Sequence, residues 1–344
     1  CPPMDINFGD YLRALITSDY DLIDDDNMDY RIAMIEAFQR RGIYPDELKN
    51  VSVESLLLKV EEVSADFDTK FGSLIEFFKL FKEKTSYITD RRELYELTNV
   101  FIAGGDINNA GIKLNSTKKH LEIRILGLHD RLQIKFEGQD DFAQLTGLNF
   151  KALESEKLGF GKSKNPRTNG APLLEIHNLK IASRVGPDGK LVNQILVTLT
   201  QKRGIVCDED EYGNANIVGF FVPGEAEKGW YRRISNQGGT KYKKEPYPGK
   251  GTNLAGPGSK NVLPSGWFVF RGGCTLIFDL DYAASNDNVK LKYIIKKDIN
   301  DETRIKRQYG ILFQRDENTL NATYFGSAYG NLEAEPFAII HKVL

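Results

Sequence analysis

The chain has 344 residues, of which 41% are hydrophobic and 27% charged, so it can bury the cores of two or three domains. Its 46 basic and 48 acidic residues leave a formal net charge of -2, which excludes a chain that acts mainly by coating nucleic acid or an anionic membrane. No apolar run approaches the roughly 18 residues that span a bilayer, so we expect no membrane partner.

The cysteines and the first residues indicate a compartment. Cys1, Cys207 and Cys274 cannot form a disulfide framework, because three thiols leave at least one unpaired. The opening stretch contains prolines and an acidic residue, whereas a secretory leader is basic and then apolar. We therefore expect a reducing compartment and a cytoplasmic protein.

Residues 1–105 are predicted to form a helical region. Apolar residues recur at helical spacing over 8–16, an acidic loop follows over 19–26, and a second helix covers 30–41 before a glycine stop. Further helices are predicted over 53–63, 66–84 and 91–102.

After residue 105 the pattern changes to strand alternation. Residues 121–125 and 132–136 alternate between apolar and polar, which predicts strands in a mixed connector over 106–170. The connector ends in a loop rich in Gly, Lys and Ser over 151–170.

A β-hairpin is the clearest local prediction. Residues 174–179 and 193–200 alternate on either side of a turn that contains Pro187, Asp188 and Gly189. Pro presets φ and Gly accepts a positive φ, so this tripeptide favours a reversal of the chain.

The rest of the chain completes an α+β fold. Its N-terminal helical region is followed by a largely antiparallel β-rich domain over 171–344 with a late helix. The longest irregular segment is predicted over 232–266. The remaining elements are predicted strands over 216–222, 267–271, 273–281 and 289–297, a helix over 300–314 and a last strand within 322–344.

The residue spacing contains no complete catalytic or metal-binding motif. Gly161-Lys162-Ser163 has the ending of a phosphate-binding loop, but position 156 is Glu where that loop needs Gly. Glu175 and His177 share a face of one predicted strand, and two ligands do not make a metal site. We predict no catalytic or metal-ligating residue, with a hydrolase complete in this chain and built around Glu175 and His177 as the alternative.

A basic segment over 228–260 carries aromatic residues between its charges. Rings could stack on bases while the cations neutralise phosphates, and the alternative is a solvated loop balanced by the acidic run 208–211. We favour the solvated loop and do not expect a nucleic-acid partner. The candidate binding residues are Arg232, Arg233, Lys241, Lys243 and Lys244.

Two stretches of the sequence resemble a known family. Both resemble the C-terminal part of large, uncharacterised bacterial proteins that carry a gluzincin-like, thermolysin-type metallopeptidase domain ahead of this region. The resemblance covers about the first 45 residues and much of 172–300. The residues that carry it are 1–17, Asp19, Tyr30-Arg31, Ile35-Glu36-Ala37-Phe38 and Arg40-Arg41-Gly42-Ile43 in the first stretch, and His177, 184–189, 198–202, 270–276 and 293–297 in the second.

The resemblance implies a non-catalytic role for this chain. In that family the zinc-binding HExxH helix would precede this region, so zinc is expected only in an upstream portion and no ligand is carried over. Residues 1–42 would end a peptidase-like helical subdomain, and the β-rich part would be an accessory domain. We expect a C-terminal fragment or subunit that acts as a structural or protein-binding module; the alternative is a hydrolase activity that requires an upstream chain.

Helices that end a larger subdomain should carry apolar stripes shaped to meet a neighbour. Phe8, Leu12 and Leu15 form one stripe, and Ile35 and Phe38 form another. Left uncovered, they would exceed the apolar patch that soluble monomers usually expose. We therefore predict that residues 1–42 meet another chain, either a protein partner or a second copy.

Overall fold

The computed structural model shows N-terminal helices followed by a largely antiparallel seven-stranded sheet, which confirms the α+β class. The last strand predicted within 322–344 lies outside the described residues. Those are 1–313 except 24, 46, 47, 49, 59–73, 107–123, 165, 169, 187, 188, 190, 237, 238, 249–262 and 281–289.

The helices lie at both ends of the described chain. They are α1 (Phe8–Leu22), α2 (Tyr30–Gln39), α3 (Val53–Leu56), α5 (Ile75–Thr85), α6 (Arg91–Ala103), α7 (Leu128–Phe136), α8 (Asp140–Thr146) and α10 (Glu302–Phe313), with 3-10 turns η2 (Ser155–Leu158) and η3 (Ala226–Lys228). The acidic loop predicted over 19–26 begins later than expected, because α1 continues to Leu22.

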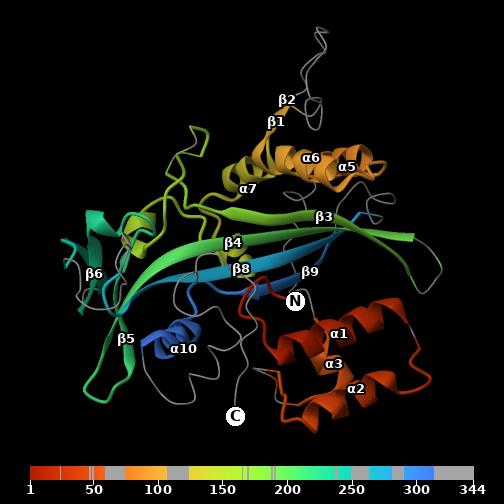
Figure 1. The fold of residues 1–344 in the computed structure, drawn as a ribbon, viewed down its shortest axis with the longest axis horizontal. Helices are drawn as coiled ribbons and strands as arrows, with labels where there is room; N and C mark the ends of the chain where they lie inside the picture. Colours follow the sequence, from red (N-terminus) through yellow and green to blue (C-terminus); the bar gives the residue numbers. More distant parts are fainter. Residues whose placement is uncertain are drawn as a thin grey trace.

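The main sheet is built around one long strand. Its members are β3 (Glu175–Val185), β4 (Leu191–Glu209), β5 (Ala215–Phe221), β6 (Trp230–Asn236), β7 (Gly239–Glu245), β8 (Trp267–Asp279) and β9 (Lys290–Lys297), and β1 (Gly105–Asp106) pairs separately with β2 (Arg124–Ile125). β8 lies along one edge of β4, while the other edge pairs first with β3 and then with β5 (Figure 1). The predicted hairpin is confirmed as the β3–β4 pair, with Gly189 at φ +73°.

One face of the sheet is covered by α5–α8, which contribute to a single apolar core with β3, β4, β8 and β9 (Figure 1). Phe78 of α5 meets Phe278 of β8 with ring centroids 5.3 Å apart. The strand predicted over 132–136 is wrong, because this segment belongs to α7. Leu128, Leu132 and Phe136 follow one another at four-residue spacing and are all buried, whereas Ile134 is 49% exposed.

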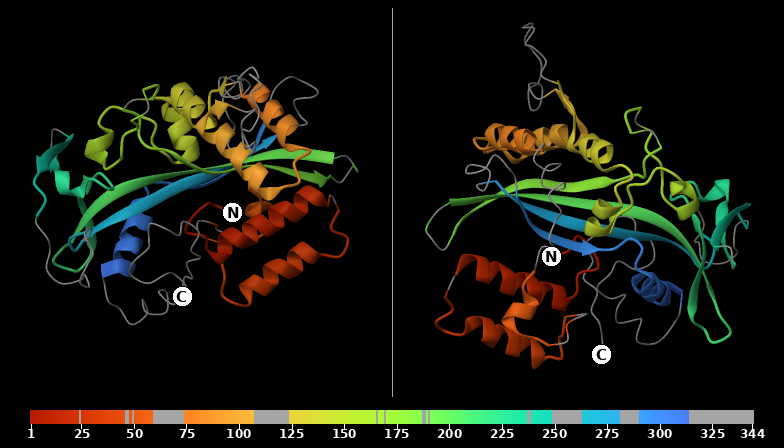
Figure 2. Two further views of the ribbon diagram at one scale, coloured as in Figure 1. Left: turned by 45° about the horizontal axis from the view of Figure 1, so that its top comes forward. Right: turned by 180° about the vertical axis from the view of Figure 1, so that it is seen from behind.

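The opposite face is approached by α1–α3, which build a core of their own (Figure 2). Leu12 and Ile16 of α1 pack against Ile35 of α2 and Leu56 of α3. This small core shares no buried residue with the core above the sheet.

α10 packs against the other end of the sheet, where β9 no longer flanks β8. Ile305 and Tyr309 join Phe268 and Phe270 of β8 in a further core. The prediction of an irregular segment over 232–266 is wrong in part, because β7 and most of β6 fall within it and form a hairpin.

Candidate functional site

The predicted interface residues divide between the inside and the outside of the N-terminal helices. Leu12 is fully buried and Ile35 is 5% exposed, so both are already covered within this chain. Phe8 is 40% exposed, and Leu15 and Phe38 are partly buried. Of the two predicted stripes, the part that remains at the surface lies on α1.

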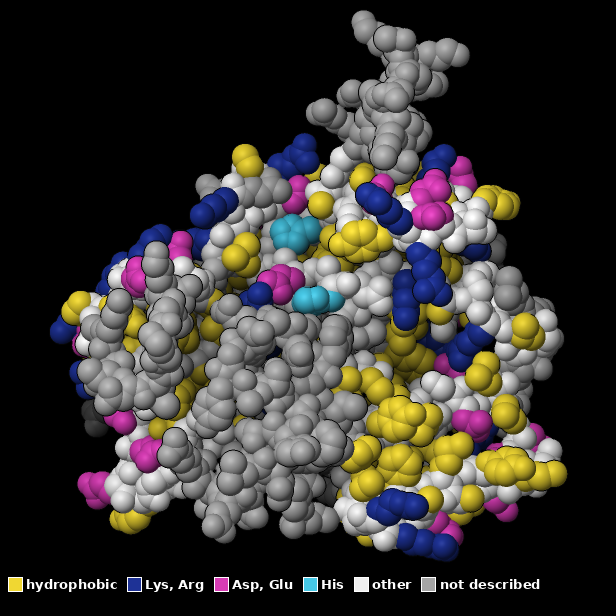
Figure 3. All heavy atoms as spheres, viewed as in Figure 1, with side chains coloured by type: hydrophobic (Ala, Val, Ile, Leu, Met, Phe, Trp, Pro, Cys, Tyr) yellow, Lys and Arg dark blue, Asp and Glu magenta, His cyan; other side chains and the backbone are white. Residues whose placement is uncertain are grey.

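One face of α1 carries apolar side chains in a row that Ser18 and Asp19 interrupt. Phe8, Tyr11, Leu15 and Leu22 follow one another at intervals of three, four and seven residues, which places them on one side of a helix. Phe8, Tyr11 and Leu22 are each at least 40% exposed. Figure 3 shows hydrophobic side chains gathered over the N-terminal helices. We call these four residues the α1 row.

The interface residues predicted from the sequence did not include Tyr11 and Leu22, although their spacing from Phe8 places them on the same side of a helix. Half of the exposed large hydrophobic side chains among the described residues fall within 8–44, including Ile23, Met28 and Tyr30. Such a concentration in a small part of the chain is typical of a surface that binds another protein.

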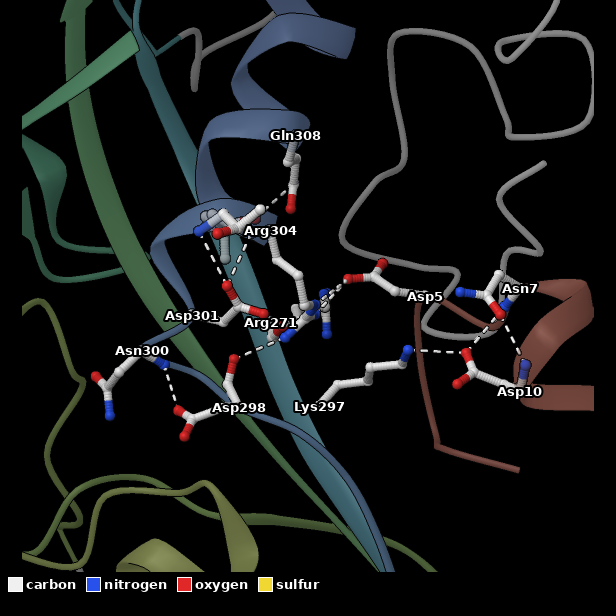
Figure 4. A network of polar contacts seen from close by, with 12 residues as sticks. Asp5, Asn7, Asp10, Arg271, Lys297, Asp298, Asn300, Asp301, Arg304 and Gln308 are labelled. Carbon is white, nitrogen blue, oxygen red and sulfur yellow. Dashed lines mark hydrogen bonds and ion pairs between the residues drawn. The ribbon is translucent and has the colours of Figure 1, made fainter. Parts of the chain in front are cut away.

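Carboxylates of α1 and of the segment before it form ion pairs with the sheet and with α10. Asp10 closes a capping box with Asn7 and also forms an ion pair with Lys297 of β9, with 2.8 Å between Oδ2 and Nζ (Figure 4). Asp5 pairs with Arg304 of α10, whose Nε lies 3.0 Å from the Asp5 carboxylate. Arg304 also donates to the carbonyls of Arg271 and Asp298, which places this contact at the unpaired edge of β8.

Asp21, near the end of α1, connects two strands that are not neighbours. Its carboxylate accepts hydrogen bonds from Arg184 of β3 at 2.8 Å, and from Lys292 at 2.9 Å and Tyr293 at 2.7 Å on β9. Burial opposes ionisation of Asp21, but these three donors prevail and hold the pKa of its carboxyl below the usual value. We call Asp5, Asp10 and Asp21 the acidic anchors.

The face of the sheet beneath α1 is polar. The pairing register places Glu175, Thr200, Gly273 and Lys297 in one row across β3, β4, β8 and β9. Thr200 is 1% exposed, and its hydroxyl has no hydrogen-bond partner among the described groups. A Cβ on Gly273 would lie within 3.0 Å of both Pro3 and Met4, so the N-terminal segment lies directly on this row.

Glu175 and His177, around which the alternative hydrolase prediction was built, lie together with Lys202 in a cluster of ion pairs. Lys202 Nζ lies 2.8 Å from one Glu175 carboxylate oxygen, and His177 Nε2 lies 3.5 Å from the other. The hydrogen bond from His177 and the charge of Lys202 lower the pKa of Glu175 to about 2, against the opposing effect of burial. A carboxylate with so low a pKa is a weak general base at neutral pH.

Two of the three cysteines are buried, whereas Cys1 is exposed. Burial raises the pKa of Cys207 to about 12 and that of Cys274 further, so both thiols stay protonated at neutral pH. Within the described ranges no three His, Cys, Asp or Glu side chains are placed to hold a metal ion.

The described part of the basic segment contains the β6–β7 hairpin, which carries basic and aromatic side chains on both faces. Alternation places Arg232, Lys241 and Lys243 on one face, while Tyr242 lies on the other and packs on Phe220 with centroids 6.0 Å apart. Arg233 and Lys244 share the face of Tyr242, and Arg233 lies 3.5 Å from Glu302 of α10. Lysines along an exposed edge strand such as β7 also discourage pairing with other chains.

No described helix is both long and apolar enough to cross a bilayer.

Comparisons with known proteins identify no family for this chain. No protein-family model, curated protein or solved structure matches the chain.

Proposed function

We propose that this chain is a non-catalytic protein-binding module whose docking surface is the α1 row. The observation that carries the proposal is the exposure of Phe8, Tyr11 and Leu22 along one side of α1, next to the side on which Leu12 and Ile16 are already buried. Apolar side chains in such a row match the i, i+3, i+7 anchors by which helices dock onto partner proteins.

The partner that this surface fits is a protein with an apolar face, either the peptidase-like portion that the family resemblance implies or a second copy of the chain. Because Phe8, Tyr11 and Leu22 are 40–48% exposed, burying the rest of their surface contributes on the order of 2–4 kcal/mol before the cost of association. These side chains would therefore be one part of a larger interface.

The test replaces Tyr11 and Leu22 by Glu and compares the variant with Leu94→Glu/Tyr95→Glu. Leu94 and Tyr95 are also exposed but lie on α6, away from the α1 row. Leu12 is unsuitable, because a charge there would disrupt the core of the N-terminal helices. Sedimentation measures self-association, and a photo-cross-linker at position 11 captures a second protein in the native host.

Loss of the assembly or of the cross-linked protein in the α1 variant alone supports the proposal. A monomer that yields no cross-link from position 11, or an assembly that both variants preserve, would overturn it.

Nucleic-acid binding is a second candidate, which rests on the three basic side chains on one face of the β6–β7 hairpin. Its support is weaker, because Tyr242 lies on the opposite face and cannot stack on a base bound to those cations. Salt-dependent binding of DNA or RNA that disappears in Arg232→Ala/Lys241→Ala/Lys243→Ala would establish it.

A further inference from the structure

We propose that α1–α3 and the segment before them form a detachable cover, which the three acidic anchors hold over the polar face of the sheet. This inference does not depend on the partner of the α1 row. It concerns a movement of the N-terminal helices relative to the sheet, and it follows from three features of the contact between them.

The first feature is that the cover is internally complete. Leu12, Ile16, Ile35 and Leu56 bury one another, so the helices keep their core if they leave the sheet. Arg31 of α2 fastens α1 and α2 together, with its Nε 2.7 Å from the carboxylate of Asp19. A unit with its own core and its own internal ion pair can move as one body.

The second feature is that the contact with the sheet depends on charge. Each acidic anchor has a basic partner on the sheet or on α10, and the side chains in these pairs are between 7% and 28% exposed. Partly buried pairs of this kind are strong enough to hold a contact, yet they weaken when one charge is removed. Pro3 and Met4, which are both buried, contribute apolar contact to it where they lie on Gly273.

The third feature is that the covered state contains unfavourable local features that release would remove. Asp5 adopts a left-handed backbone conformation with φ +49° while it pairs with Arg304. The buried hydroxyl of Thr200 has no hydrogen-bond partner among the described groups, and water would supply one once the cover lifts. The covered state therefore depends on the ion pairs to outweigh these costs.

The experiment measures the rate at which an alkylating reagent reacts with a thiol placed on the covered face of the sheet. Thr200→Cys places a thiol under the cover and removes no hydrogen bond, because the hydroxyl makes none with the described groups. Cys274 lies on the neighbouring strand, opposite Leu199, and is fully buried in the core above the sheet. Its alkylation therefore reports opening of the sheet itself, and mass spectrometry of the peptides distinguishes it from Cys at position 200, from the exposed Cys1 and from the buried Cys207.

We expect Asp5→Asn/Asp21→Asn to speed alkylation of Cys at position 200 at least about tenfold, a factor that corresponds to ~1.4 kcal/mol. Alkylation of Cys274 should stay as slow as before. For the chain that carries Thr200→Cys but keeps all three acidic anchors, a higher salt concentration should also speed alkylation at position 200, by a smaller factor.

The matched control is Asp140→Asn, which removes the exposed ion pair between Asp140 of α8 and Lys151. It should change neither the alkylation rate at position 200 nor that of Cys274. Alkylation at position 200 that remains slow in the double variant would overturn the proposal. So would equal acceleration at both thiols, because that result means global unfolding rather than release of the cover.

Discussion

Glu175 illustrates how one side chain can be held ionised by its neighbours. His177 and Lys202 lower its pKa to about 2, so its contribution to stability is fully present above the ordinary carboxyl pKa near 4.5 and disappears as the pH falls through about 2. Because the Glu175 side chain is 38% exposed, solvent screening reduces this contribution to about 1 kcal/mol.

We therefore expect Glu175→Gln to lower the thermal unfolding temperature at pH 7, with the difference from the unmodified chain shrinking between pH 4.5 and 2. Thermal denaturation followed by circular dichroism across this range measures it. Glu96→Gln, which removes an exposed pair with Arg92, provides the control and should have little effect at any pH. A difference that persists unchanged at pH 2 would contradict the assignment.

Gly189 is constrained by its backbone alone. It adopts φ +73° in the β3–β4 turn, and a Cβ there would meet no atom within 4 Å. Gly189→Ala should therefore destabilise the protein by about 1 kcal/mol through backbone strain, and Gly189→Asn should cost less because Asn tolerates this conformation. Chemical denaturation measures both, and equal stability of all three proteins would show that the turn differs from this description.

At the scale of elements, α10 replaces a strand at the edge of β8. Arg304 Nη2 donates to the carbonyl of Arg271 at 3.0 Å, and Gln308 Nε2 donates to that of Val269 at 3.4 Å. These carbonyls are two residues apart, so they point to the same edge of β8, beyond the last residue paired with β9. The helix thus satisfies backbone groups that the sheet leaves open.

Arg304→Met should destabilise the protein by about 3 kcal/mol, because it leaves a buried carbonyl and the Asp5 carboxylate without their donor. Gln308→Met removes one long hydrogen bond and should cost about 1 kcal/mol or less. Urea denaturation of the two variants tests the comparison. Equal losses would mean that Arg304 contributes no more than an ordinary edge contact.

At the scale of the whole molecule, the sheet presents a different chemistry on each face. Its upper face meets α5–α8 through a large apolar core, whereas its lower face meets α1 through the acidic anchors (Figure 1). Burial of apolar area stabilises the contact with α5–α8 without any need for charge. The contact with α1 includes ion pairs, so it is sensitive to charge substitutions and to salt. This asymmetry underlies both the α1 row, which is displayed on the outside, and the proposed release of the cover.

Local signals in the sequence determined the fold class and several elements. The hairpin around Gly189 followed from turn chemistry, and α2, α6 and α10 followed from helical periodicity and end signals, because these depend on residues close together in the chain. A short alternation of apolar and polar residues, in contrast, misassigned α7 as a strand. Leu132, Ile134 and Phe136 fit a strand over five residues, and only packing shows that Leu132 and Phe136 are buried while Ile134 is not.

Tertiary structure alone decided the candidate site. Leu12 and Ile35 belong to the expected apolar stripes, yet they cover each other, and this left Phe8, Tyr11 and Leu22 as the exposed row. The partners of the acidic anchors lie far along the chain, with 163 positions between Asp21 and Arg184 and 299 between Asp5 and Arg304. Composition and spacing fix which groups can pair, but which ones meet depends on how β3, β9 and α10 are brought together by the long central ladder of β4 and β8.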